Sequence, residues 1–355
     1  MSTVKHNPSN IMSFKRLFSG GIAASILMMA AALASAEDRH HKQAHHDHAH
    51  HNQGSHAHDG HHAHEDHHAH HYTQAQTQGY ADTSRSRMTV IPEHIRSKTE
   101  IAISNYPLFL LSEAVTKGAP SGKLLLQPGD VGHHGSLSPS DMKTVKDSRY
   151  VVWFGSQLES NLANSVGKSP NNISLFRFNA FNRLPLRDVK GEAIEGTLDP
   201  HLWLDPDNAK AITRALGSLY SRANPQYKAV YAANVQKFAK QMDEAVAQVQ
   251  VNSQTSRPYW AYHDAFGYIE SALNLKLAGA LTIDHHLPPK ASQFHWLNKT
   301  RPQPTMCMVL QSDSNKGALP KLKPVNSTIQ QEDMSDAKDF ISGWTALAKD
   351  INNCI

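Results

Sequence analysis

The chain has 355 residues, 25 of them histidine, and a net charge of +4 when histidine is counted as neutral. No segment carries the basic stripe that a nucleic-acid-binding surface needs, so this composition excludes that class of protein.

The first predicted element is a secretory signal peptide at residues 1–36. Lys15 and Arg16 precede an apolar run at 22–33, which ends in the sequence ASA. This pattern is typical of a cleaved signal, and the run is short for a membrane span. No cysteine stands at the cleavage point after Ala36, which argues against a lipid anchor. We therefore expect an exported, soluble protein whose net charge falls to +1 after cleavage.

Residues 40–71 form a tract in which half of the residues are histidine. Because the tract has almost no apolar side chains, it cannot offset the entropy of ordering its backbone, so we expect 37–87 to be a disordered tract and linker. Neutral imidazole is the commonest protein ligand for zinc. The plain alternative is a solvated low-complexity tail with incidental metal affinity. The predicted auxiliary metal ligands are His40, His41, His45, His46, His48, His50, His51, His56, His58, His61, His62, His64, His67, His68, His70 and His71.

From residue 88 onward the composition is globular, and predicted strands alternate with predicted helices. We expect strands at 99–104, 123–126 and 149–155 and a helix at 108–116. Ser138, Pro139 and Asp141 have the order of an N-cap, a first helical residue and a capping-box acid, so another helix begins there. This alternation predicts an α/β fold with mostly parallel sheets.

One long helix is predicted from Pro225 to about Val251, where apolar residues recur at three- and four-residue steps without glycine or proline. About 27 residues give a helix roughly 40 Å long. A second series of strands and helices begins at Tyr259. We therefore expect an N-terminal lobe at 88–222, a rigid connecting helix within 223–254 and a C-terminal lobe at 255–355. A long core helix in a single domain is the alternative.

Three histidines outside the tract share similar local settings. His133 follows a predicted strand, and His201 lies shortly before Asp205, which is placed to cap a helix. His263 ends the predicted strand PYWAYH, and Asp264 is placed to cap the helix that follows. Ligands of open α/β sheets bind beyond the carboxyl ends of strands, so we expect the three imidazoles to converge on one cleft. A single histidine in such a place is usually structural.

The sequences GHHGSLSPSD, DPHLWLDP and AYHDAFGY contain these histidines and resemble the ligand segments of the cluster A-I metal-binding proteins. The most similar type is the periplasmic zinc-binding component of bacterial high-affinity zinc ABC importers. The resemblance covers residues 100–355 and implies two α/β lobes joined by one long helix, with zinc between them. It implies a periplasmic, non-enzymatic receptor that delivers zinc to an inner-membrane ABC permease. We expect this receptor to be a monomer.

By this resemblance the zinc ligands are His133, His201 and His263. A late acidic residue or water completes the site in relatives, and Asp333 lies where that acid is expected. Glu332 and His134 are further candidate ligands. We expect the pair His285 and His286 to be exposed and to stay outside the site. The chain departs from the family pattern at Gly132, Gly135 and Gln311.

The two cysteines, Cys307 and Cys354, suggest a disulfide because the protein is exported and neither lies in a CxxC motif. The resemblance implies the same pairing, since many zinc-binding members have a terminal disulfide.

Three other functions compete with the zinc receptor. A manganese or iron receptor of the same fold would favour carboxylate oxygens, whereas three imidazoles favour zinc. A periplasmic zinc buffer or chaperone would depend on the tract alone. The string HEDHH at 64–68 matches the H-E-x-x-H pattern of zinc hydrolases, but it lacks an apolar helical face, so we expect no enzyme.

Overall fold

The structure, a computed structural model, describes residues 100–130, 136–283, 287–312 and 314–355. The predicted signal peptide, histidine tract and linker lie outside these residues.

The first half of the described chain contains a parallel four-stranded sheet in the order β2-β1-β3-β4. Its strands are β1 (Ile101–Ile103), β2 (Lys123–Leu124), β3 (Tyr150–Trp153) and β4 (Asn172–Ser174). Strands β1 and β3 are buried along their whole length, as apolar strands in the centre of a parallel sheet should be. The predicted strands are thus confirmed, with shorter ends.

Helix α2 (Tyr106–Thr116) follows β1, and helix α3 (Pro139–Asp147) precedes β3. The capping box predicted for α3 is present, because the Ser138 hydroxyl accepts from Asp141 N and the Asp141 carboxylate accepts from Ser138 N. Short 3₁₀ turns occupy η1 (Ser160–Leu162), η2 (Leu175–Arg177) and η3 (Leu202–Leu204). Helix α4 (Pro206–Ala223) then begins as predicted, with Asp205 accepting from the backbone N–H groups of its first turn.

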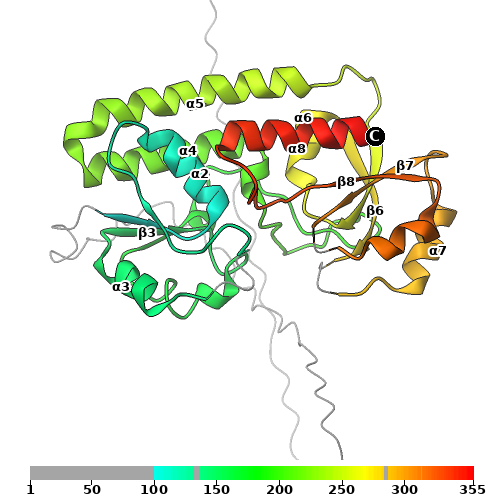
Figure 1. Ribbon diagram of the computed structural model, residues 1–355, viewed down its shortest axis with the longest axis horizontal. Helices are drawn as coiled ribbons and strands as arrows, with labels where there is room; N and C mark the ends of the chain where they lie inside the picture. The colour runs from blue at the N-terminus through cyan, green and yellow to red at the C-terminus, as the bar shows by residue number, and fades with distance from the viewer. Residues whose placement is uncertain (1–99, 131–135, 284–286, 313) are drawn as a thin grey trace, which may run out of the picture. The chain divides into compact units, whose positions relative to one another are not determined.

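A 3₁₀ turn, η4 (Pro225–Tyr227), leads into the longest helix of the described chain, α5 (Lys228–Val249). Its buried residues are Tyr231, Phe238, Met242, Ala245 and Val249, the spacing that the sequence predicted for one apolar face. Helix α5 contacts α2 and α4, which precede it, and α8, which follows much later (Figure 1). The predicted long helix therefore packs against helices from both halves of the described chain.

The second half contains another parallel four-stranded sheet, in the order β6-β5-β7-β8. Its strands are β5 (Arg257–His263), β6 (Leu275–Thr282), β7 (Met306–Leu310) and β8 (Val325–Ile329). The remaining elements are η5 (Gly267–Ile269), α6 (Glu270–Leu273), α7 (Ala291–Lys299), η6 (Lys316–Leu322) and α8 (Phe340–Cys354). Each sheet is parallel throughout, which confirms the predicted α/β fold class.

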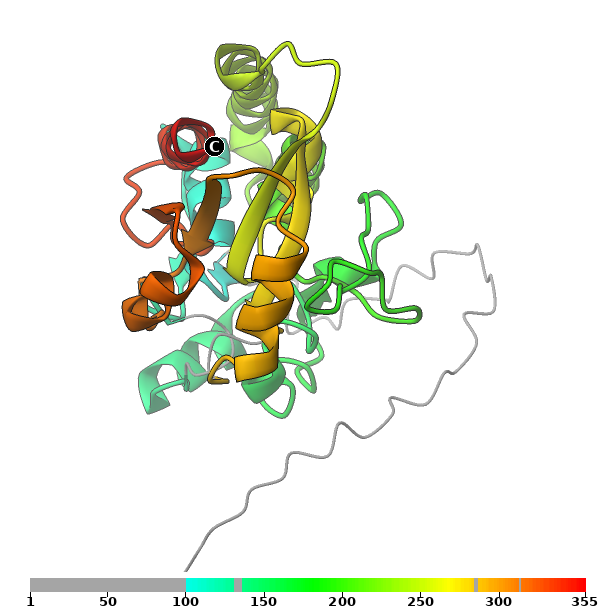
Figure 2. The same ribbon diagram turned by 90° about the vertical axis from the view of Figure 1, so that its right-hand side faces the viewer.

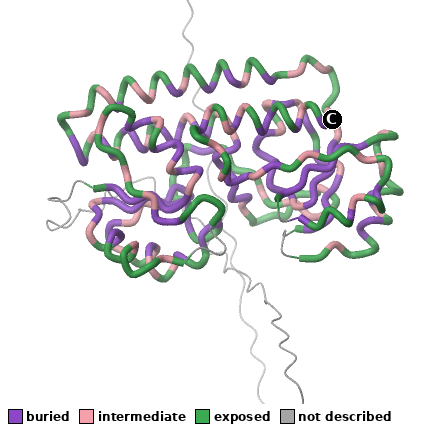
Figure 3. The backbone as a smooth tube through the Cα atoms, viewed as in Figure 1, coloured by how far each residue is buried: buried purple, intermediate pink, exposed green. Residues whose placement is uncertain are grey.

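One buried cluster contains residues of both sheets, of α5 and of α8, and Figure 3 shows the buried strands in purple. The disulfide is confirmed, and it joins Cys307 in β7 to Cys354 at the end of α8. None of the helices in the described part of the chain is long and apolar enough to cross a membrane. In each sheet the second strand in sequence lies on one side of the first strand, β1 or β5, and the later strands lie on its other side. Open α/β sheets bind ligands at such a change in strand order.

Candidate metal centre

His201 is held by the carboxylate of Asp199. Asp199 Oδ1 accepts a hydrogen bond from the His201 backbone N–H at 3.0 Å and lies 2.7 Å from the ring Nδ1. Both residues are buried, with 4% and 5% of their surface exposed. A proton on Nδ1 shared with Asp199 leaves Nε2 with the lone pair, and a carboxylate behind an imidazole strengthens it as a metal ligand. His201 is therefore oriented to offer Nε2.

The same carboxylate affects the protonation of the ring. Burial lowers the pKa of His201, but the charge and hydrogen bond of Asp199, with contributions from Glu332 and Asp264, outweigh burial and raise the pKa above its ordinary value. A metal ion binds only the neutral imidazole, so it competes with a proton that this environment favours.

His263 is the last residue of β5, at the carboxyl end of the strand, as the sequence predicted. Its ring centroid lies 6.0 Å from that of His201, and the two ring planes make an angle of 66°. Two imidazoles on one tetrahedral zinc, with Zn–N bonds of about 2.0–2.1 Å, have centroids roughly 5 Å apart. The two rings therefore lie about 1 Å from the spacing that one shared ion requires.

Side chains from other segments contact the His263 backbone and the carboxylate of the next residue, Asp264. The Gln311 side chain donates a long hydrogen bond from Nε2 to the His263 carbonyl at 3.4 Å, so this departure from the family pattern contacts the end of β5. The prediction that Asp264 caps a helix is wrong. Arg187 holds both Asp264 oxygens, at 2.8 and 2.7 Å, and the next turn, η5, begins after Phe266 instead.

The late acidic residues lie close to the His201 segment. Trp203, two residues after His201, donates its indole N–H to the backbone carbonyl of Glu332 at 2.7 Å. Glu332 and Asp333 are both buried. Asp333 Oδ1 accepts from the backbone N–H of Ser335 at 3.0 Å, so one oxygen of the expected fourth ligand is used within its own turn.

Asp333 also lines a cavity of about 10 Å³, about the volume that one water needs, together with Asn105, Tyr106, Trp203 and Asp130. Asp130 is three residues before His133 in the sequence. The last described residue before His133 therefore lies beside the same small cavity as Asp333.

His133 and His134 lie outside the described residues, as do His285, His286 and the whole histidine tract. Within the residues that the structure does describe, no group of three or more histidine, cysteine, aspartate or glutamate side chains is arranged to hold a metal ion. The structure brings together His201 and His263 and places Asp333 near the chain that leads to His133.

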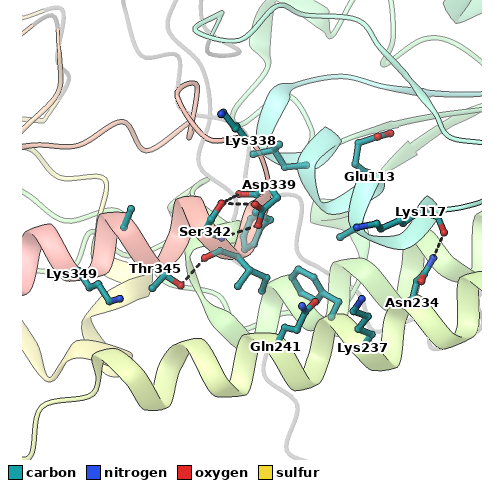
Figure 4. Close-up of a pocket in the computed structure, with 16 residues that line it drawn as sticks. Glu113, Lys117, Asn234, Lys237, Gln241, Lys338, Asp339, Ser342, Thr345 and Lys349 are labelled. Carbon is teal, nitrogen blue, oxygen red and sulfur yellow. Dashed lines mark hydrogen bonds between the residues drawn. The ribbon is translucent and has the colours of Figure 1, made fainter.

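A larger cavity, of about 840 Å³, lies between α2, α5 and the start of α8 (Figure 4). Its lining includes Lys117, Lys237, Lys338 and Lys349 above apolar residues such as Phe238. No histidine lines it, and its two carboxylates, those of Glu113 and Asp339, are fewer than the three ligands that a metal group would need, while lysine ammonium groups do not bind metal cations. This cavity is therefore not a candidate metal centre.

Sequence reasoning missed Asp199 and Arg187. Asp199 stands two residues before His201 in the quoted segment DPHLWLDP, and its position before a candidate ligand was a usable signal because metal-binding histidines usually donate their other ring N–H to a carboxylate. Arg187 lies 77 residues from its partner Asp264, and no local pattern relates the two.

Known proteins resemble this chain in sequence and in fold. A family model described as "Zinc-uptake complex component A periplasmic" matches residues 101–317. The high-affinity zinc uptake system protein ZnuA of Brucella abortus (strain 2308) is 22% identical over an alignment of 239 residues, which covers 56% of this chain and 72% of that protein. ZnuA of Haemophilus ducreyi is 26% identical over 228 residues, 55% of this chain and 71% of the relative.

Solved structures share the fold. A crystal structure of ZnuA superposes with a TM-score of 0.60 at 15% identity and covers 72% of this chain and 99% of its own. The periplasmic zinc-binding protein TroA from Treponema pallidum gives a TM-score of 0.57 at 14% identity, with the same two coverages. The match of the family model over more than half of the sequence settles the relationship: the chain belongs to the family of periplasmic A components of zinc-uptake complexes.

Proposed function

We propose that this protein is the zinc receptor of a periplasmic uptake system, and that it captures the ion with His201, His263 and His133. It delivers zinc to an inner-membrane ABC permease and works as a monomer after cleavage behind Ala36. The observation that carries the proposal is the pair of imidazoles whose centroids lie 6.0 Å apart, one of them backed by the buried carboxylate of Asp199.

The donor set suits zinc. Three neutral imidazoles with one carboxylate or water give a four-coordinate, nitrogen-rich site. Zinc favours such a site more than manganese does. We propose Asp333 as the fourth ligand, because it is buried and lies beside the chain leading to His133, with Glu332 as its competitor. A receptor needs only to bind and release, so no residue is required to carry out a reaction.

The test is zinc stoichiometry and affinity in a protein without residues 40–71. We expect one tightly bound zinc per chain, measured by mass spectrometry after dialysis and by competition with a chromophoric chelator. The triple variant H133A/H201A/H263A should lose it. H295A is the matched control, because His295 is exposed on α7 and remote from the proposed ligands in sequence.

The outcomes separate the competing functions. Stoichiometric zinc in the triple variant would refute the ligand assignment. Loss of all tight binding on deletion of residues 40–71 would favour the buffer, since its only working part is the tract.

A further inference from the structure

A segment between β4 and η3, residues 182–199, folds back on itself and reaches the second sheet. Its two arms are joined by hydrogen bonds from Ile194 N to Leu186 O and from Asp199 N to Leu184 O, both at 2.8 Å. Near its tip, the Val189 carbonyl accepts from Ala280 N in β6 at 2.9 Å. Figure 2 shows this green segment projecting beside the yellow strands. We call residues 182–199 the hairpin.

The hairpin carries Arg187 to a cluster of two largely buried carboxylates, those of Asp264 and Glu270. The Arg187 Nε and Nη2 atoms donate to the two oxygens of Asp264 at 2.8 and 2.7 Å, and Nη1 lies 2.8 Å from Glu270 Oε1. The side chains of Arg187, Asp264 and Glu270 are 17%, 8% and 17% exposed. The guanidinium fork thus occupies both oxygens of Asp264 and neutralises part of the cluster.

This cluster adjoins both histidines of the metal centre. Asp264 directly follows His263, and a methyl group built on Gly267 would lie 3.3 Å from both Arg187 Nη2 and Asp199 Oδ2. Arg187, which holds the carboxylate next to His263, therefore also lies close to Asp199, the carboxylate that orients His201.

Carboxylate oxygens are the donors that hard cations such as Mn²⁺ prefer, whereas zinc accepts imidazole nitrogen readily. Without the guanidinium, the carboxylate of Asp264 would leave uncompensated negative charge next to His263. Such charge would attract a hard divalent cation and supply oxygen ligands for it.

We propose that Arg187 determines metal specificity: by holding both oxygens of Asp264, it keeps oxygen donors away from His263 and restricts the site to imidazole-rich binding. Arg187 acts through Asp264 and does not itself touch the ion, so it is a positioning residue. This proposal rests on the proposed zinc-receptor function and adds a feature of the site that favours zinc over manganese.

The experiment compares Zn²⁺ and Mn²⁺ affinities of the full mature chain and its variants. Zinc is measured by chelator competition, and manganese by the electron paramagnetic resonance signal of the free ion. We expect R187Q to raise the affinity for Mn²⁺ relative to Zn²⁺ at least tenfold. The double variant R187Q/D264N should return the ratio to the wild-type value, since the freed carboxylate is then gone. The histidine tract is the same in every variant, so a difference between variants arises outside it.

R183Q is the matched control, because Arg183 belongs to the same hairpin but donates to the backbone carbonyls of Phe176 and Phe178 instead. Its metal ratio should equal the wild-type ratio. If R187Q does not fold, R187K replaces it: lysine keeps the charge but lacks the fork, so a smaller shift in the same direction is expected.

An unchanged ratio in folded R187Q, or in R187K where R187Q is unfolded, would overturn the proposal. So would a shift that persists in the double variant. Both results require that the wild-type chain binds one zinc tightly. If the wild type binds no stoichiometric zinc, the receptor function itself fails, so the two failures are distinguishable.

Discussion

The contact between Asp199 and His201 gives the sharpest test of the metal centre. In D199N the side-chain amide oxygen can still accept a hydrogen bond from the His201 backbone N–H. The ring Nδ1 of His201, however, loses its anionic partner. Hydrogen bonds to a charged group contribute about 1.5–3 kcal/mol, and removing the carboxylate behind a ligating histidine typically weakens metal binding about 10–100-fold. We therefore expect the zinc dissociation constant of D199N to rise by that factor.

The assay is chelator competition at pH 7.5 on protein without residues 40–71, so that weak sites do not obscure the result. D207N is the matched control, because it makes the same change of aspartate to asparagine at an exposed position. Asp207 pairs with Lys210 on α4 at 2.9 Å. Its zinc affinity should not change. A folded D199N that binds zinc within twofold of the wild type would refute the orienting role of Asp199.

The remaining predictions concern pH, the disulfide, the tract and a crowded glycine. Because the pKa of His201 is raised in the folded apoprotein, its pairing with Asp199 stabilises the fold fully below the unfolded pKa of about 6.5, and this contribution disappears as pH rises through the folded pKa. The thermal midpoint of wild-type apoprotein should therefore exceed that of D199N more at pH 5.5 than at pH 8.5, and an equal difference would contradict this. The Cys307–Cys354 disulfide spans 47 positions, so the C307S/C354S variant should lose about 4 kcal/mol of unfolding free energy in denaturant titrations; a loss below about 1 kcal/mol would count against the chain-entropy account. In calorimetric zinc titrations, deletion of residues 40–71 should abolish a weak phase that involves several ions and leave the tight phase intact. In the full chain this weak phase should fade below about pH 6.5, because protonated imidazole does not bind zinc. G267A should weaken zinc binding up to about tenfold because its methyl group would crowd Arg187 and Asp199 at 3.3 Å, and unchanged affinity would show that these groups move without consequence.

The sequence by itself determined the local structure of this protein. Ser138 and Asp141 produce a capping box wherever the following residues are helical, because their hydrogen bonds reach only three residues. Asp205 caps α4 for the same reason, and the apolar spacing of α5 shows its buried face. His263 at a strand end follows from the apolar run before it. These features depend on neighbours in the chain, so a local pattern is enough to predict them.

Only the tertiary structure decided which partner each polar group near the metal centre takes. Asp264 stands where a helix cap is plausible, yet Arg187, 77 residues away, holds both of its oxygens. A buried carboxylate must be paired, and a bidentate guanidinium neutralises its charge while a backbone N–H does not.

The distance between the two described histidines is likewise decided by the tertiary structure and not by the sequence pattern. The rings of His201 and His263 lie 6.0 Å apart because η3 and β5 converge in the fold, and no spacing along the chain encodes that distance. Sequence patterns record interactions over a few residues, whereas the site is assembled from segments 62 residues apart, and their meeting depends on how the whole core packs.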